Sequence, residues 1–227
     1  MLIVLVPLLP LLAAIIVLIA EPETQYERAK LGVLTLGAAF IGSLITLGVV
    51  TSHGAISIRF YDPSSIANLA LPLGFYIDRL SAVMMVLISG IGTIIYHYSV
   101  NYMYQDRGYG RYLALVAFTT FALLCMVSSI NLVMLFVCWQ SLSYSLSLLA
   151  HNLSHAATLA GAFRTFTLLR VGDVAFLAGI VLAHSLYGTI EYHELFARAA
   201  DTPGTLSPLP GIELCGATAV TLLLFIG

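Results

Sequence analysis

Residues 112–150 read YLALVAFTTFALLCMVSSINLVMLFVCWQSLSYSLSLLA and contain no Asp, Glu, Lys or Arg. A helix that crosses a lipid bilayer needs about 20 predominantly apolar residues. This stretch is long enough for two such helices, and the small polar residues Ser128, Ser129 and Asn131 favour a tight turn between them. The sequence here predicts a helical hairpin within a membrane.

Apolar runs of the same kind occupy most of the 227 residues. Six of them approach spanning length, and a seventh begins near Ile212 and continues to Gly227. The six runs are residues 2–20, 31–52, 80–103, 112–129, 130–150 and 163–187. We therefore expect an all-α, polytopic transmembrane helical bundle, with residues 1–227 forming a single membrane domain.

The composition excludes several classes of protein. Hydrophobic residues make up 60% of the chain and charged residues only 9%, whereas a soluble domain carries about 25% charged residues. Disordered chains need low hydrophobicity and high net charge, and the net charge of -2 leaves no basic surface for nucleic acid. The three cysteines are far apart in apolar runs, so Cys125, Cys138 and Cys215 are interpreted as small packing residues.

Three connections carry recognisable patterns. Residues 53–79 are expected to form an external loop with a short β-segment, because polar and apolar residues alternate over residues 56–60. Residues 188–211 are expected to form an external linker, with a short amphipathic helix followed by a Pro-rich stretch. Tyrosines flank the short turn at residues 104–111 and indicate an aromatic belt at a membrane surface.

The distribution of Lys and Arg predicts the orientation, since cytoplasmic connections carry the excess of basic residues. The connections after the first, third and fifth runs are the richer set, with Arg28, Lys30, Arg107, Arg111, Arg164 and Arg170. The even-numbered connections hold Arg59, Arg79 and Arg198. We therefore expect the N-terminus outside and the odd-numbered connections in the cytoplasm.

Arg170 and Asp173 are the charged pair at membrane depth. They are three residues apart, so they lie on one helical face and can pair. Buried charges of this kind either line or gate an ion path or form a structural ion pair. Both interpretations stay open from the sequence, and Arg164, nearer the cytoplasmic end, is grouped with the structural residues.

Trp139, Gln140 and His97 are the other candidates. Gln140 follows the chain's only tryptophan and can hydrogen-bond or hold water, but it does not carry a proton. His97 is either a proton relay or an interfacial histidine with a satisfied hydrogen bond. His151 and His155 are four apart, yet no third ligand is evident, so neither a metal site nor a cofactor is expected in this chain.

Several segments, taken in order, resemble one family. They are FYIDRLS (75–81), GIG (90–92), YS (98–99), YM (102–103), GYGRY (108–112), NL (131–132), WQ (139–140) and LRVGD (169–173). This order and spacing resemble the N-terminal part of the large antiporter-like membrane subunits, over about residues 70–190. That family includes the L-type proton-pumping subunit of complex I (NADH-quinone oxidoreductase) and the large subunit of multisubunit cation/proton antiporters.

The resemblance implies two inverted five-helix repeats with broken helices near the midplane. It implies that the first repeat begins at the fourth run, and that a key lysine of the family follows Gly227. A complete channel therefore needs residues beyond this chain, from a longer protein or from another chain. The resemblance also implies that the protein lies in a bacterial cytoplasmic (inner) membrane. It implies a transporter subunit rather than an ordinary enzyme. If the protein belongs to NADH-quinone oxidoreductase instead, it would be part of a translocase of that type.

Gln140 departs from the family pattern, because proton-pumping members have glutamate after that tryptophan. Arg170 and Asp173 match the family by position. One branch comprises membrane subunits of two-component inorganic carbon transporters, whose cytoplasmic partner is a zinc protein similar to carbonic anhydrase. This branch is favoured by Gln140 and by Ala150–Asn152 (AHN). The alternative partners are the other subunits of complex I or of a cation/proton antiporter.

Overall fold

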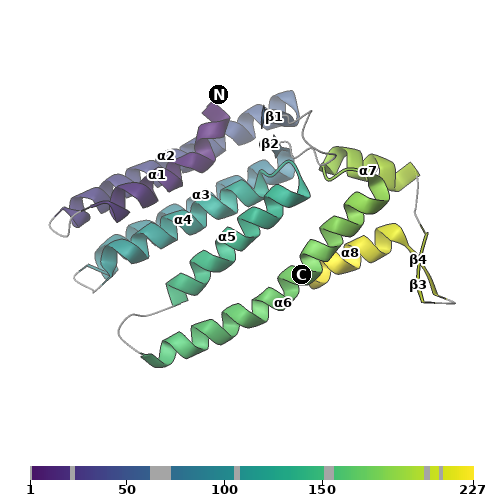
Figure 1. Ribbon diagram of the computed structural model, residues 1–227. Helices are drawn as coiled ribbons and strands as arrows, with labels where there is room; N and C mark the ends of the chain where they lie inside the picture. The colour runs from purple at the N-terminus through teal and green to yellow at the C-terminus, as the bar shows by residue number, and fades with distance from the viewer. Residues whose placement is uncertain are drawn as a thin grey trace.

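The computed structural model describes residues 2–20, 24–61, 73–104, 108–150, 156–201, 205–209 and 212–227. Its helices are α1 (Leu2–Leu18), α2 (Gln25–His53), α3 (Arg79–Tyr102), α4 (Tyr109–Val127), α5 (Leu132–Ala150), α6 (Ala156–Tyr187), α7 (Tyr192–Asp201) and α8 (Gly216–Ile226). Its strands are β1 (Ile56–Tyr61), β2 (Leu73–Ile77), β3 (Thr205–Leu209) and β4 (Ile212–Cys215). Figure 1 shows the long helices lying roughly side by side.

Among the described helices, α2 to α6 are long and apolar enough to cross a membrane. With 17 residues, α1 lies at the lower limit of spanning lengths, and α8 has only 11. Each predicted apolar run overlaps one of these helices over most of its length, so the all-α polytopic bundle is confirmed. The count of six complete spans stays a prediction.

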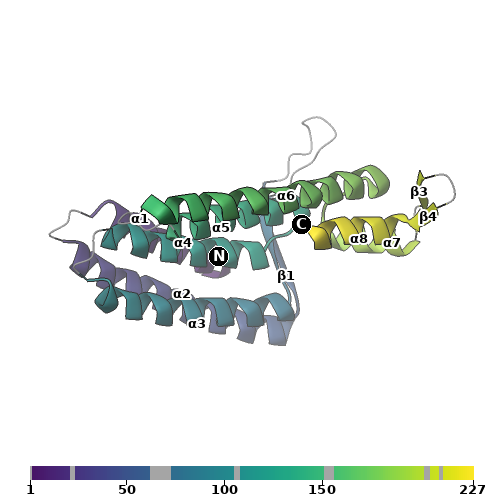
Figure 2. The same ribbon diagram turned by 90° about the horizontal axis from the view of Figure 1, so that it is seen from below.

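The helices pack mainly against their neighbours in sequence, with α1 also against α4 and α6 against α8. Figure 2 shows α2 and α3 on one side of the bundle and α6 on the other, with α4 between them. Leu36, Tyr96 and Leu113 are fully buried where α2, α3 and α4 meet. This arrangement leaves the α5–α6 interface as a separate layer, away from that cluster.

The helix ends alternate between the two ends of the bundle. The C-terminal ends of α1, α3 and α5 lie at one end in Figure 1, and those of α2, α4 and α6 lie at the other. This alternation agrees with the expected division into odd-numbered and even-numbered connections. Which end faces the cytoplasm stays a prediction.

Tyrosines gather at the α3–α4 end of the bundle, as the sequence indicates. The rings of Tyr26 and Tyr104 are 4.7 Å apart, and those of Tyr104 and Tyr109 are 6.2 Å apart. Tyr98 and Tyr102 stack at 5.3 Å on the exposed surface of α3. Amphipathic rings clustered at one end of a bundle suit the boundary between lipid and water.

Two helices begin earlier than the apolar pattern indicates. Gln25 opens α2 six residues before the predicted run, and Ala156 opens α6 seven residues before its run. In α2 the added residues, QYERAK (25–30), are mostly polar, and main-chain hydrogen bonds continue into them although hydropathy does not report them. In α6 the added residues, AATLAGA (156–162), are small and mostly apolar, so the predicted run simply began too late. In α2 the added turns contain the surface ion pair of Lys30 with Glu27, at 3.1 Å.

The β-segment expected within residues 53–79 is confirmed as β1, which pairs antiparallel with β2. The predicted turn between α4 and α5 is also confirmed, and it contacts this hairpin, because the backbone N–H of Tyr76 donates to the carbonyl of Ser128 at 2.9 Å. On the other side of the same turn, the N–H of Leu132 donates to the carbonyl of Ile190 at 3.2 Å. These bonds join three connections at one end of the bundle.

The expectation for residues 188–211 is partly wrong. The amphipathic helix is present as α7, but the Pro-rich stretch is not a plain linker, since β3 pairs antiparallel with β4. Pro208 lies within β3, and a proline is tolerated in a strand whose N–H is not needed by a second neighbour. The paired residues are close in the chain, from Leu209 with Ile212 to Thr205 with Cys215, and the Pro-Gly dipeptide at residues 210–211 is a turn signal that the linker interpretation did not use.

Candidate functional site

Arg170 and Asp173 form an ion pair within α6. Nη1 of Arg170 lies 3.1 Å from Oδ2 of Asp173, as their three-residue spacing predicts. The side chain of Asp173 is 8% exposed and that of Arg170 is 27% exposed. Charges at this depth in an apolar helix are costly unless they are paired, and the pair meets that requirement.

Two consecutive residues of α5 contact this pair. Nε1 of Trp139 donates to Oδ1 of Asp173 at 3.1 Å. Oε1 of Gln140 accepts a hydrogen bond from Nη1 of Arg170. The four side chains form one polar cluster across the α5–α6 interface, in which α5 supplies a donor to the acid and an acceptor to the base.

Two aromatic rings cover the guanidinium of Arg170. Its Cζ lies 4.5 Å from the ring centre of Phe166 and 4.9 Å from that of Tyr144. Cation–π contacts of this geometry stabilise a guanidinium that has lost water. Sequence reasoning missed both rings, although Phe166 precedes Arg170 by four residues and Tyr144 follows Gln140 by four, which places each on the same helical face as its neighbour.

Part of the Arg170 guanidinium is unsatisfied. Nε and Nη2 are buried and have no hydrogen-bond partner among the described residues. Buried donors of this kind can hold an ordered water or an acceptor from a neighbouring segment. The cluster therefore has unused hydrogen-bonding capacity at two donors of Arg170, beside its ion pair.

The chemistry of the cluster depends on Asp173. An arginine guanidinium is a permanent cation, and a glutamine amide does not bind a proton. Asp173 is the carboxylate among these side chains, so a proton exchanged within the cluster would bind there. This arrangement suits proton binding and charge gating, and it also suits a structural ion pair.

The structure does not bring the other predicted residues into this cluster. His97 is exposed on α3, beside Tyr98 and Asn101, and α3 packs on α2 and α4. Arg164 is exposed on α6 before Arg170. His151 and His155 lie outside the described residues. Within the part of the chain that the structure describes, no three His, Cys, Asp or Glu side chains come together as metal ligands.

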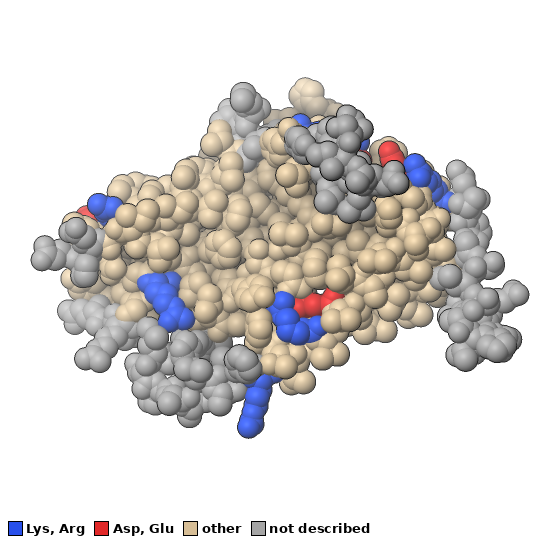
Figure 3. Space-filling model, in the orientation of Figure 1, with Lys and Arg blue, Asp and Glu red and all other residues tan. Residues whose placement is uncertain are grey.

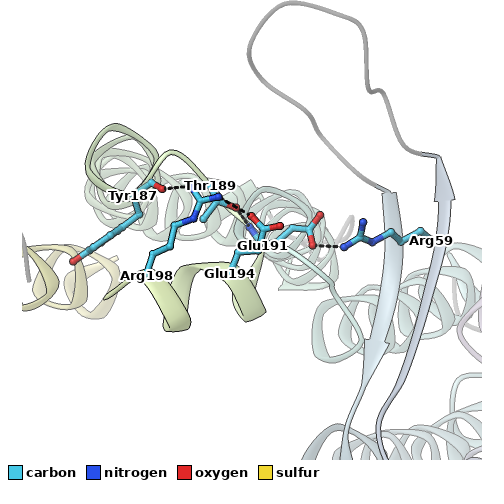
Figure 4. A network of polar contacts seen from close by, with 6 residues as sticks. All are labelled: Arg59, Tyr187, Thr189, Glu191, Glu194 and Arg198. Atoms are coloured by element: carbon cyan, nitrogen blue, oxygen red, sulfur yellow. Dashed lines mark hydrogen bonds and ion pairs between the residues drawn. The ribbon is translucent and has the colours of Figure 1, made fainter. Parts of the chain in front are cut away.

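A second polar network joins the connections at one end of the bundle (Figure 4). Nη2 of Arg59 in β1 pairs with Oε2 of Glu191 at 2.7 Å. In the same network, Nη1 of Arg198 donates to the carbonyl of Tyr187 at 2.7 Å, and its Nη2 lies 3.3 Å from Oε2 of Glu194. These contacts hold α7 against the end of α6 and tie β1 to the residue before α7.

Tyr192, at the start of α7, completes this end of the molecule. Burial raises the pKa of its phenol, and the hydrogen bond with Ser129 at 3.4 Å opposes that shift. The phenol is therefore neutral, and its contact with the α4–α5 turn is structural.

The charged side chains visible in Figure 3 lie on a surface that is otherwise mostly uncharged.

The chain is similar to known proteins in both sequence and fold. The family described as NADH-Ubiquinone oxidoreductase (complex I), chain 5 N-terminus, matches residues 64–113. The probable inorganic carbon transporter subunit DabB1 of Halothiobacillus neapolitanus is 34% identical over 212 residues, which cover 91% of this chain and 36% of that protein. The chain is a homologue of the antiporter-like membrane subunits.

A second relative of this chain is NADH-quinone oxidoreductase subunit L of Neisseria meningitidis serogroup B. It is 27% identical over 195 residues, which cover 84% of this chain and 29% of that protein. A chain of respiratory complex I from Thermus thermophilus has the same fold, with a TM-score of 0.75 and 21% identity, over 98% of this chain and 43% of that chain.

The chain is an integral membrane protein. The chain spans about a third of the length of the curated relatives it matches. The predicted family resemblance is confirmed, and its matched region includes the FYIDRLS, GIG and GYGRY segments.

Proposed function

We propose that this antiporter-like subunit translocates protons or other cations and that the α5–α6 cluster lies on the ion path. The observation that carries the proposal is the buried carboxylate of Asp173, which contacts Arg170 within its own helix and Trp139 across the interface. A membrane-embedded acid with both oxygens engaged is either a functional proton site or a structural tie.

Each side chain has a distinct role in this proposal. Asp173 binds the mobile proton, and Arg170 gates it by pairing with the charged carboxylate. Gln140 holds Arg170 toward α5, at the position where the family resemblance implies an acid in proton-pumping members. Trp139 holds the carboxylate of Asp173 in place through its N–H donor. His97, on α3 outside the cluster, is a separate candidate for proton exchange. Arg164 has a structural role.

Proton flux through the full-length protein in sealed vesicles tests this assignment. Asp173→Asn keeps the shape of the side chain and removes its titration, so the flux should fall at least tenfold while the protein stays in the membrane. Glu194→Gln is the matched control, because it removes the same charge from an exposed ion pair with Arg198. A structural anchor would lose stability with Asp173→Asn and show no change in flux per folded molecule.

We propose inorganic carbon uptake as the process that the subunit energises. Two observations support this choice over a redox complex: the 34% identity to the DabB1 subunit and the amide at position 140. The proposed partner is a cytoplasmic zinc protein similar to carbonic anhydrase, and no cofactor is proposed for this chain itself. The alternative is a proton-pumping subunit of NADH-quinone oxidoreductase or of a multisubunit cation/proton antiporter.

Purification of the full-length protein in mild detergent, with mass spectrometry and metal analysis, distinguishes these partners. A stoichiometric zinc protein is the expected result. Co-purification of flavin and iron–sulfur subunits would overturn carbon uptake and favour the respiratory alternative.

The proposed location is a bacterial cytoplasmic membrane with the N-terminus outside. Reporter fusions to the ends of α1 and α2 would test this orientation.

A further inference from the structure

A groove is present on the outer face of α3, near the end of the bundle where the tyrosines gather. The groove has a volume of about 460 Å³ and is lined by Ile94, His97, Tyr98, Asn101 and Tyr102. Their spacing of three and four residues places them on one helical face, and all five are exposed. Because α3 packs on α2 and α4, this groove is separate from the α5–α6 cluster.

The face of α3 that carries the groove changes from apolar to polar along the helix. Leu87 and Ile91 precede Ile94 by seven and three residues, so they continue the same face toward the middle of α3, and all three are exposed. Asn101 and Tyr102 lie in the last turn of α3. An amphiphile fits such a face, with its chain on the apolar part and its head group at the polar end.

The polar end of the groove offers hydrogen-bond donors. The hydroxyl of Tyr26 in α2 donates to Oδ1 of Asn101 at 3.4 Å. That bond uses the acceptor of the amide and leaves its N–H group as a donor. The ring N–H of His97 and the hydroxyl of Tyr102 are further donors. Several donors at one end of an apolar face suit an anionic oxygen, because hydrogen bonds to charged acceptors are the stronger ones.

A cation lies beside this end of the groove. Nζ of Lys30 in α2 lies 4.2 Å from the ring centre of Tyr26, the residue that contacts Asn101. Lys30 also pairs with Glu27 at 3.1 Å, but both side chains are at least half exposed, and exposed pairs of this kind contribute little. The ammonium is therefore available to a second anion, which favours a phosphate over an uncharged head group.

The position of the groove fits the depth of a lipid head group. The start of α2 and the end of α3 lie at the same end of the bundle (Figure 1), among the tyrosines that suit the boundary between lipid and water. At this depth a phospholipid has its phosphate next to the first carbons of its acyl chains. A helix from a neighbouring subunit would cover the apolar part equally well, but it has no phosphate to meet the donors and the ammonium.

We propose that this groove binds a phospholipid, with the phosphate at Asn101, Tyr102 and Lys30 and an acyl chain along Ile94 and Ile91. The site differs from general lipid contact because it selects the head group. The inference does not depend on the proposed transport function, since it concerns only the outer face of α2 and α3.

Photolabelling of the full-length protein in vesicles tests the site. The vesicles consist of digalactosyldiacylglycerol, whose head group is uncharged, with a trace of phosphatidylglycerol that carries a diazirine in one acyl chain. Mass spectrometry of the linked peptides should locate the label on residues 87–94. That label should be about fivefold stronger than the label from a galactolipid with the same diazirine chain, as expected for one lysine near an anionic group. Unlabelled phosphatidylglycerol should compete for it.

Two variants and a matched control assign the selectivity to the groove. Lys30→Gln and Asn101→Leu should each lower the phospholipid label on residues 87–94 several-fold and leave the galactolipid label unchanged. Arg79→Gln removes an exposed cation from the opposite end of α3 and should change neither label. All three positions are exposed, so the variants should keep the unfolding temperature of the wild type.

Three results would overturn the proposal. Equal labelling by the two lipids would show contact with bulk lipid only. Unchanged head-group preference in both Lys30→Gln and Asn101→Leu, or an equal loss in Arg79→Gln, would remove the site from this groove. Absence of the label from residues 87–94 when the protein is illuminated in its native complex would assign the groove to a neighbouring subunit instead.

Discussion

The two carboxylate oxygens of Asp173 contact residues of two different helices. Trp139 of α5 donates to Oδ1 and Arg170 of α6 pairs with Oδ2, each at 3.1 Å. The two contacts come from opposite sides of the α5–α6 interface, so any relative movement of these helices changes at least one of them. This relationship makes Asp173 sensitive to the position of α5.

The indole N–H of Trp139 should stabilise the fold through Asp173. Trp139→Phe removes the donor and keeps an aromatic ring, so the free energy of unfolding in detergent should fall by about 1–3 kcal/mol. The same substitution should cost clearly less in a background with Arg170→Leu and Asp173→Leu, where no carboxylate remains. Equal losses in both backgrounds would show that Trp139 acts through packing alone.

Removing the base should cost more than removing the acid. Arg170→Gln leaves the carboxylate of Asp173, 8% exposed, without its counter-charge, and breaking a buried pair in this way costs about 3–5 kcal/mol. Asp173→Asn leaves Arg170 with Gln140 and two aromatic rings, so its loss should be smaller. Unfolding of the two variants in the same detergent gives the comparison, and the reverse order would contradict the geometry.

Gln140 should matter as an acceptor rather than as an amide. Gln140→Leu removes the oxygen that accepts from Arg170 and should destabilise the protein by about 1–3 kcal/mol. Gln140→Glu keeps an acceptor at that place and should be tolerated better. Thermal unfolding of both variants provides the measurement. If the leucine variant equals the wild type, the hydrogen bond carries no stability.

Gly92 should be needed for the close approach of α3 to α4. A Cβ at Gly92 would lie 2.8 Å from Oγ1 of Thr120, whereas a Cβ at Gly48 would meet nothing within 4 Å. Gly92→Ala should therefore lower the unfolding temperature, and Gly48→Ala should leave it unchanged or raise it, because alanine favours helix by about 1 kcal/mol. Similar effects at both positions would argue against close packing at Gly92.

Much of the fold follows from hydropathy and turn residues. The apolar runs coincide with most of the long helices, the Ser128–Asn131 turn joins α4 to α5, and the alternation at residues 56–60 becomes β1. These features are local, since each depends on residues close together in the chain. The β3–β4 pairing and the early start of α2 depend on main-chain hydrogen bonds, which hydropathy does not report.

The candidate site was predictable only within one helix. The three-residue spacing of Arg170 and Asp173 predicts their ion pair, and the structure shows it. The contact of Trp139 with Asp173 joins residues 34 apart and depends on how α5 and α6 rotate about their axes. No sequence pattern reports that rotation, so the sequence indicated the residues of the cluster but not which atoms meet. The ion-path role of these residues stays a prediction.

The most direct test of the central claim is whether Asp173 changes its protonation when a proton gradient drives the full-length protein. Infrared difference spectra of vesicles before and after the gradient is applied would record the carboxyl band. The account predicts a protonated-carboxyl band that forms and decays with the gradient in the wild type and is absent in Asp173→Asn. Normal proton flux with no such band, or the same band in Asp173→Asn, would contradict it.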